Sequence, residues 1–149
     1  MAQTYIGSTL RTGSDTLTDS TNGGFVVVSQ TTTVETAAAG TATSASLTLP
    51  ASSQIIDLII DTIQDESVGG GTATAINATI GTAAAGTQYL SATDVIGGGR
   101  IALSFTTAQC AAMDDIGTNT SVFITVDPNG TISTTQGIYR LTVVYAQKV

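Results

Sequence analysis

Residues 138–146 read Ile-Tyr-Arg-Leu-Thr-Val-Val-Tyr-Ala, and this stretch decides the fold. Every second residue in it is large and apolar, and that set is Tyr139, Leu141, Val143 and Tyr145. The residues between them are Ile138, Arg140, Thr142 and Val144. A period of two places successive side chains on opposite faces of a β-strand. The stretch therefore predicts a strand with one face turned toward a core.

The composition extends this prediction to the rest of the 149-residue chain. Hydrophobic residues make up 42% and charged residues only 10%, and the polar remainder is mostly threonine, serine and glycine. Threonine is β-branched and suits a pleated, half-exposed surface. Because long polar helix formers are scarce, we expect an all-β protein.

Other stretches carry strand patterns and are separated by glycine-rich breaks or by Pro50. They are residues 25–34, 41–49, 55–63, 73–81, 88–92, 101–105 and 121–126. About eight strands at this spacing are typical of a sandwich or a barrel. We expect a jelly-roll-like β-sandwich.

Residues 55–63 fit two patterns. As a helix they would align aspartates four residues apart, where like charges repel. As a strand they would place Ile56, Leu58 and Ile60 on one face. Isoleucine dominates the segment and favours strands, so we expect a strand.

One short inserted helix is expected at about residues 106–116. Thr106 is its predicted N-cap, and Gln109 completes a capping box three residues later. Gly117 is the expected C-terminal stop. Cys110, the only cysteine, is expected to be a buried small hydrophobe, since it has no cationic neighbour to make it reactive.

The chain divides into a predicted arm and a domain. Residues 1–23 are rich in threonine, serine and glycine, and residues 24–149 carry the strand patterns. The sizeable apolar groups of the first segment are Tyr5, Ile6 and Leu10. The segment is either a frayed terminus or an extended arm that docks on a neighbour. In the second interpretation these three residues are the candidate partner-binding residues.

Residue counts exclude several kinds of chemistry. There is no histidine and only one cysteine, so neither a histidine-based catalytic triad nor a Cys/His zinc site can be built. Four basic residues against eleven acidic ones give a net charge of -7, which disfavours nucleic acid as a partner. No apolar stretch approaches the roughly 20 residues of a membrane-spanning helix. We therefore expect no enzyme activity, no catalytic residue, no metal site and no cofactor.

Acidic residues leave two rival interpretations. The adjacent pairs Asp65-Glu66 and Asp114-Asp115 could serve acid–base catalysis, but both lie at ends of expected elements, where acids are usually solvated. Asp127-x-Asn129-Gly130 faintly resembles part of a calcium loop, although the ligand positions around it are incomplete. A turn explains that motif more simply. Calcium held between subunits remains an alternative.

Several short phrases resemble small structural proteins of tailed bacteriophages. They are Leu47-Thr48-Leu49-Pro50-Ala51 with Gln54-Ile55-Ile56-Asp57, residues 81–89, residues 105–109 with 113–117, and Val143-Val144-Tyr145-Ala146-Gln147. The likeness covers residues 25–149. It implies a capsid decoration (cement) protein, which sits on the outer shell of the virion as a homotrimer and bridges capsomers. The family has no catalytic residues to carry over.

The expected function is therefore a virion structural protein on the capsid surface. Its expected partners are the major capsid protein and further copies of itself, without nucleic acid or membrane. One alternative is a head-vertex, head-tail or tail-fibre component involved in host attachment. Alternatives from other classes are a hydrolase that uses acidic residues and a calcium-dependent adhesin.

Overall fold

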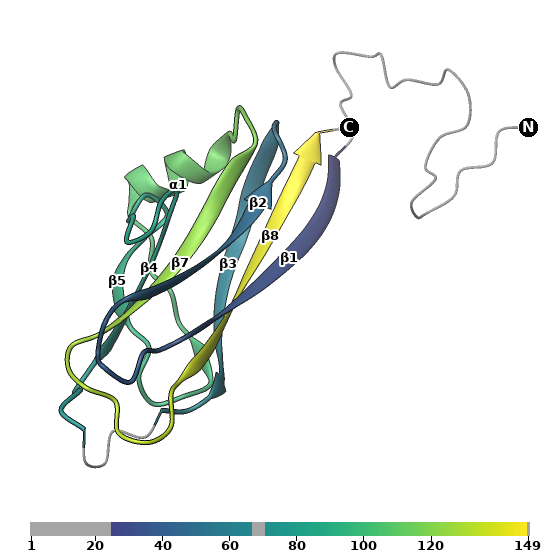
Figure 1. The fold of residues 1–149 in the computed structure, drawn as a ribbon. Helices are drawn as coiled ribbons and strands as arrows, with labels where there is room; N and C mark the ends of the chain where they lie inside the picture. Colours follow the sequence, from purple (N-terminus) through teal and green to yellow (C-terminus); the bar gives the residue numbers. More distant parts are fainter. Residues whose placement is uncertain (1–24, 67–70, 149) are drawn as a thin grey trace, which may run out of the picture.

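The computed structural model describes residues 25–66 and 71–148. The predicted arm, with Tyr5, Ile6 and Leu10, lies outside the described residues, so the arm stays a prediction. The strands are β1 (Phe25–Glu35), β2 (Thr43–Leu49), β3 (Ser53–Gln64), β4 (Ile76–Gly81), β5 (Leu90–Asp94), β6 (Arg100–Ile101), β7 (Thr120–Pro128) and β8 (Ile138–Lys148). The helix α1 (Thr107–Asp114) joins β6 to β7 (Figure 1).

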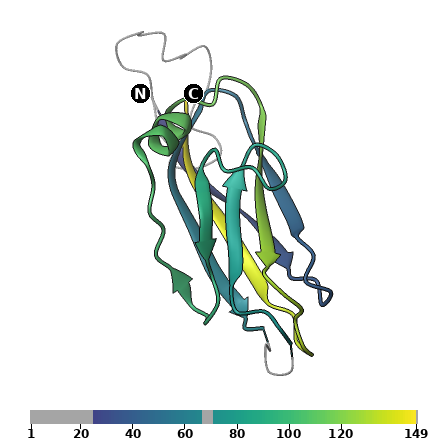
Figure 2. The same ribbon diagram turned by 90° about the vertical axis from the view of Figure 1, so that its left-hand side faces the viewer.

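The strands form two four-stranded sheets packed face to face (Figure 2). Sheet A has the order β1-β8-β3-β6, and sheet B has the order β2-β7-β4-β5. All strand pairs are antiparallel. The first and last strands are neighbours, and the chain passes repeatedly between the sheets, which is the strand order of a jelly roll. The predicted all-β, jelly-roll-like sandwich is confirmed.

The core lies between the two sheets. β8 pairs with β1 on one side and with β3 on the other. Its predicted apolar face is buried throughout, since Tyr139, Leu141, Val143 and Tyr145 are each at most 4% exposed. Sheet B meets them with fully buried residues, namely Ile76, Ala78, Ile80, Val122, Ile124 and Val126. The alternating apolar residues of the two sheets thus form one shared core.

The ambiguous segment is a strand, but one of its faces was predicted wrongly. The register of β3 against β8 shifts between Ile55 and Asp57, so that Ile56 is an extra, bulged residue. Ile55, Leu58 and Ile60 point into the core, whereas Ile56 is 54% exposed. A bulge reverses the alternation of side chains at the point where it occurs. The predicted grouping of Ile56 with Leu58 and Ile60 is therefore wrong.

The strand predicted at residues 101–105 is mostly unpaired. β6 contains only Arg100 and Ile101, which pair with Asp61 and Ile60 of β3. The chain then leaves β3 and runs along the side of the sandwich to α1 (Figure 2). Apolar alternation alone does not make a strand, because a strand also needs a neighbour within hydrogen-bonding reach.

The helix begins as the sequence predicts. Thr106 is the N-cap, its hydroxyl accepts from the Gln109 N–H at 3.2 Å, and the Gln109 side chain accepts from the Thr106 N–H at 2.8 Å. The C-terminal prediction is wrong, because the helix ends at Asp114 with Asp115 as an extended C-cap, before Gly117 is reached. The prediction for Cys110 is also wrong, since this residue is exposed.

Candidate interaction surface

The outer face of sheet A is the face turned away from sheet B. Its main side chains are Val27, Ser29, Thr31 and Thr33 of β1, Arg140, Thr142 and Val144 of β8, and Ile56, Ile59, Asp61 and Ile63 of β3. Three of the exposed large hydrophobic residues of the described chain lie here, Val27 at 61%, Ile56 at 54% and Ile63 at 53% exposed. The fourth is Val28, which is 39% exposed although it pairs with the inward-facing Tyr145 and so belongs to the inner face of β1. Exposed apolar groups on one face are typical of a surface that binds a partner.

These apolar residues lie toward the two ends of the face. The register aligns Val27 with Ala146 of β8 and Ala146 with Gln54 of β3, next to the Ile56 bulge. Ile63 is the extra residue of a second irregularity, between Thr62 and Gln64 at the far end of β3. Threonines of β1 and β8 occupy the middle. The face therefore offers apolar contacts at its ends and hydroxyl groups between them.

Both arginines of the described residues lie on this outer face and share one carboxylate. Arg100 Nε lies 3.0 Å from Asp61 Oδ1, and Arg140 Nη2 lies 3.1 Å from Asp61 Oδ2. The hydrogen bonds from Arg100 and Arg140 lower the pKa of Asp61 below its ordinary value. The group carries one net positive charge in a protein whose overall charge is -7. Asp57 of β3 and Glu35 of β1 lie on the same face, so the cluster offsets part of their negative charge.

The protein's own chain covers part of the outer face of sheet B. Its exposed strand residues include Ser44, Ser46 and Thr48. Thr125 of β7 also points outward, yet it is only 3% exposed. Its hydroxyl accepts from the Ala85 N–H at 2.8 Å and lies 2.8 Å from Ser44 Oγ. The loop that contains Ala85 therefore lies against this face.

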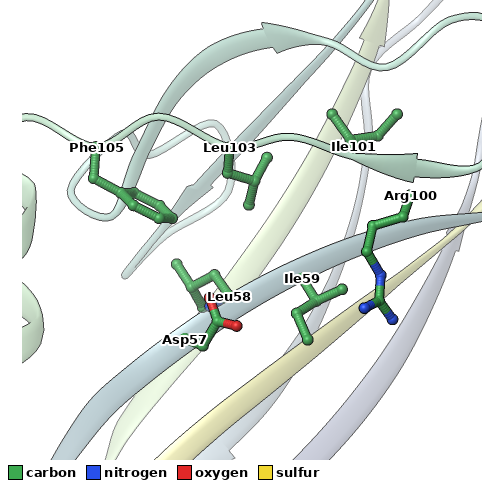
Figure 3. Close-up of a pocket in the computed structure, with 7 residues that line it drawn as sticks. All are labelled: Asp57, Leu58, Ile59, Arg100, Ile101, Leu103 and Phe105. Atoms are coloured by element: carbon green, nitrogen blue, oxygen red, sulfur yellow. The ribbon is translucent and has the colours of Figure 1, made fainter.

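A small pocket opens where β6 and β3 separate (Figure 3). The cavity is about 190 Å³ in volume and is lined by Asp57, Leu58, Ile59, Arg100, Ile101, Leu103 and Phe105. Leu103 and Phe105 reach toward β3 from the unpaired segment (Figure 3). The Leu58 N–H donates a hydrogen bond to Asp57 Oδ1 at 2.8 Å. A cavity smaller than a typical ligand site of about 300–1,000 Å³ suits one apolar side chain better than a small-molecule substrate.

The acidic pairs have structural partners. Glu66 Oε2 accepts a hydrogen bond of 2.5 Å from the hydroxyl of the buried Tyr139. Burial first, and then this bond, raises the pKa of Tyr139 above its ordinary value. Asp114 Oδ1 accepts from Gln54 Nε2 at 2.8 Å. The acid–base interpretation of either pair gains no support from these contacts.

The calcium interpretation is not supported at Asn129. Its Oδ1 accepts from the backbone N–H groups of Thr74 and Ala75 at 2.7 and 3.0 Å, and its Nδ2 donates to Thr74 Oγ1 at 2.8 Å. The side chain thus ties the chain before β4 to the end of β7. The structure places Pro128 within β7, where it pairs with Ile76. Asn129 is a structural tie between two chain segments.

In residues 25–66 and 71–148, no cluster of three or more Cys, Asp or Glu side chains could hold a metal ion. The only helix found there, α1, has eight residues, and no helix in that part is long and apolar enough to cross a membrane.

Sequence reasoning missed the outer face of sheet A. The predicted partner-binding residues Tyr5, Ile6 and Leu10 lie outside the described residues, so the structure does not bring them to this face or to any other. The alternation of β1 was a usable signal for Val27. No sequence signal marked Ile56, because its exposure depends on a bulge.

Comparisons with known proteins add no assignment. No family model matches the chain, and no curated protein and no solved structure matches it either. The fold therefore rests on the strand order, and the function has to be argued from the surface.

Proposed function

We propose that this protein is a non-enzymatic structural component of a tailed-bacteriophage virion. It binds the outer surface of the capsid and stabilises the shell by bridging neighbouring capsomers, as a homotrimer. The sequence phrases described above support the virion assignment. The observation that carries the binding role is the outer face of sheet A, with Val27, Ile56 and Ile63 each more than half exposed.

Such a role requires a stable fold and a contact surface but no reactive group. A protein that binds the assembled shell and not its dispersed subunits stabilises the assembly by mass action. Hydroxyl groups such as those of Thr31 and Thr142 form hydrogen bonds at a contact without the large desolvation penalty of paired charges. The apolar residues at the ends of the face add burial.

Matched pairs of charge-adding variants test the assignment of the face. Val27→Asp with Ile56→Asp adds two carboxylates to the outer face of sheet A, and Ser46→Asp with Thr48→Asp adds two to that of sheet B. Each purified protein is mixed with shells of the encoding virus that lack it, and bound copies are counted after sedimentation. We expect the first pair to weaken binding about tenfold or more, since it buries unpaired charge in the contact.

The control pair is expected to bind like the unchanged protein. If both pairs bind alike, the outer face of sheet A is not the contact surface. Failure of the unchanged protein to bind shells at all would contradict the capsid proposal itself. Location of the chain at a vertex or in the tail of an intact particle would favour the host-attachment alternative.

The predicted arm and the trimer have their own tests. Deleting residues 1–20 is expected to lower occupancy on the shell, and full occupancy after deletion would show that Tyr5, Ile6 and Leu10 are not anchors. The mass of the purified protein in solution is expected to be a multiple of three chains. A monomer at all concentrations would contradict the trimer.

A further inference from the structure

The free edge of β1 is the longest unpaired strand edge in the described residues. β1 is the outermost strand of sheet A and pairs over Phe25–Glu35 with β8, without a register shift. No other strand of residues 25–66 and 71–148 pairs with it. The other edge strands are shorter, with seven residues in β2, five in β5 and two in β6. A long, flat edge is a template for pairing with another chain.

The hydrogen-bond pattern shows which residues of β1 face the open edge. The Thr36 N–H donates to the Gly137 carbonyl at 2.9 Å, directly beyond the Glu35–Ile138 pair. In an antiparallel ladder, bonded and non-bonded pairs alternate. The even-numbered residues of β1 therefore bond to β8. The odd-numbered residues, from Val27 to Thr33, direct their N–H and C=O groups to the open edge.

This edge lacks the features that usually protect an edge strand. The sequence from Val26 to Val34 contains no charged residue and no proline, and its pairing with β8 contains no bulge. Native edges are commonly protected by lysine, proline or a bulge. β5, by contrast, ends in Asp94 and has a register shift in its pairing, and β6 carries Arg100. The open edge of β1 is suited to accept a strand.

We propose that β1 pairs in antiparallel fashion with β1 of a second copy of this chain, which joins the two copies of sheet A into one continuous sheet. With a two-fold axis at Gln30, Ser29 lies opposite Thr31 of the second copy, and Val27 lies opposite Thr33. Hydroxyl pairs and β-branched pairs are favourable neighbours across strands. An isologous contact of this kind satisfies the same unpaired groups on both copies.

The charge distribution of β1 permits a second copy as the occupant, and the self-complementary register favours it. Acidic residues give the chain a net charge of -7, so most surfaces of two copies repel each other. The only charged residue of β1 is Glu35, and in this pairing it lies opposite Phe25 and not opposite another acid. The pairing therefore brings two acidic molecules together along an edge that is uncharged from Val26 to Val34, without placing two acids opposite each other.

Amide hydrogen exchange of the full-length, unchanged protein tests the pairing residue by residue. In an unpaired copy, the amides of Ser29, Thr31 and Thr33 face solvent, whereas those of Gln30 and Thr32 are bonded to β8. We expect pairing to slow exchange at the three odd-numbered residues about tenfold or more as protein concentration rises. Fast exchange at these residues at every concentration would overturn the proposal.

Proline at an odd-numbered position blocks the edge without removing a bond to β8. By sedimentation analysis, we expect the Thr31→Pro variant to form particles with half as many copies as the unchanged protein. The control Thr31→Ser keeps both the N–H and the hydroxyl, and it should behave like the unchanged protein. If Thr31→Pro does not fold, Ser29→Pro provides the same test. A folded proline variant with an unchanged copy number would contradict edge pairing.

This inference is independent of the proposed function. Edge pairing would link any trimers in pairs, so the unchanged particle would contain twice the number of chains in the blocked variant. Shell binding without edge pairing would overturn only this inference. Edge pairing in a protein that never binds shells would overturn only the proposed function.

Discussion

The two outer faces of the sandwich are built from similar strands but are completed differently. On sheet B, the Ala85 N–H donates to the Thr125 hydroxyl, and a loop of the same chain lies against the sheet. On sheet A, the described chain leaves Val27, Ile56 and Ile63 more than half exposed. The loop covers sheet B around Thr125, while the hydroxyl groups of Ser44, Ser46 and Thr48 stay exposed. Exposed hydroxyl groups are therefore common to both faces, and the exposed large apolar groups distinguish sheet A.

The inner faces of the two sheets are both buried, unlike the two outer faces. Substitutions there are expected to have the largest effect on the free energy of unfolding. Leu141 of sheet A and Ile124 of sheet B are both fully buried. We expect Leu141→Ala and Ile124→Ala each to lower the free energy of unfolding by about 2–5 kcal/mol, because each leaves a cavity. Urea unfolding monitored by circular dichroism measures both. A loss in only one variant would mean that the two sheets do not share one core.

Removal of the bond that holds the loop over sheet B has the next largest effect. In Thr125→Val, the Ala85 N–H loses its acceptor while the volume of the side chain is kept. We expect a loss of about 1–3 kcal/mol in the free energy of unfolding and faster amide exchange in residues 82–88. Ser46→Ala on the same face is the control. Unchanged exchange in the loop would show that Thr125 does not hold it.

The charge cluster on sheet A should have a smaller effect that depends on pH. The pKa of Asp61 is lowered in the folded state by Arg100 and Arg140, so its contribution to stability is present above its unfolded pKa of about 3.9. That contribution is lost as pH falls through the folded pKa. We expect Asp61→Asn to cost up to about 1 kcal/mol at neutral pH.

Urea midpoints measured from neutral pH down into the acid range check this prediction. The difference between Asp61→Asn and the unchanged protein should shrink as the pH falls. A difference that stays constant down to the lowest pH would show that the carboxylate charge of Asp61 does not matter. Asp57→Asn, at an exposed carboxylate outside the ion pairs, is the control.

The exposed apolar residues should have the smallest effect on stability. Ile63→Thr on the outer face of sheet A is expected to change the free energy of unfolding by about 0.5 kcal/mol or less, since more than half of the residue is already exposed to water. Thermal unfolding measures the change. A loss of more than about 2 kcal/mol, which is typical of a core substitution, would mean that Ile63 is covered within the protein. The contrast between the two faces would then be weaker than the structure indicates.

Patterns among residues close in sequence predicted most of the fold. The alternation in β8 and the capping box of Thr106 and Gln109 depend on residues that are close in sequence. The wrong predictions share a different cause. The bulge at Ile56 and the early end of β6 depend on how β3 fits against its neighbours, and no local period encodes that fit. Most of the candidate site belongs to this second group.

By itself, the sequence determined that this protein is a β-sandwich with one capped helix and without histidine-based chemistry. Only the tertiary structure decided which side chains face water, that Arg100, Arg140 and Asp61 meet, and that one long edge of β1 has no neighbouring strand among the described residues. The physical reason is that alternation follows from the geometry of a single strand. Register, bulges and edges arise only when strands that are distant in sequence are placed side by side.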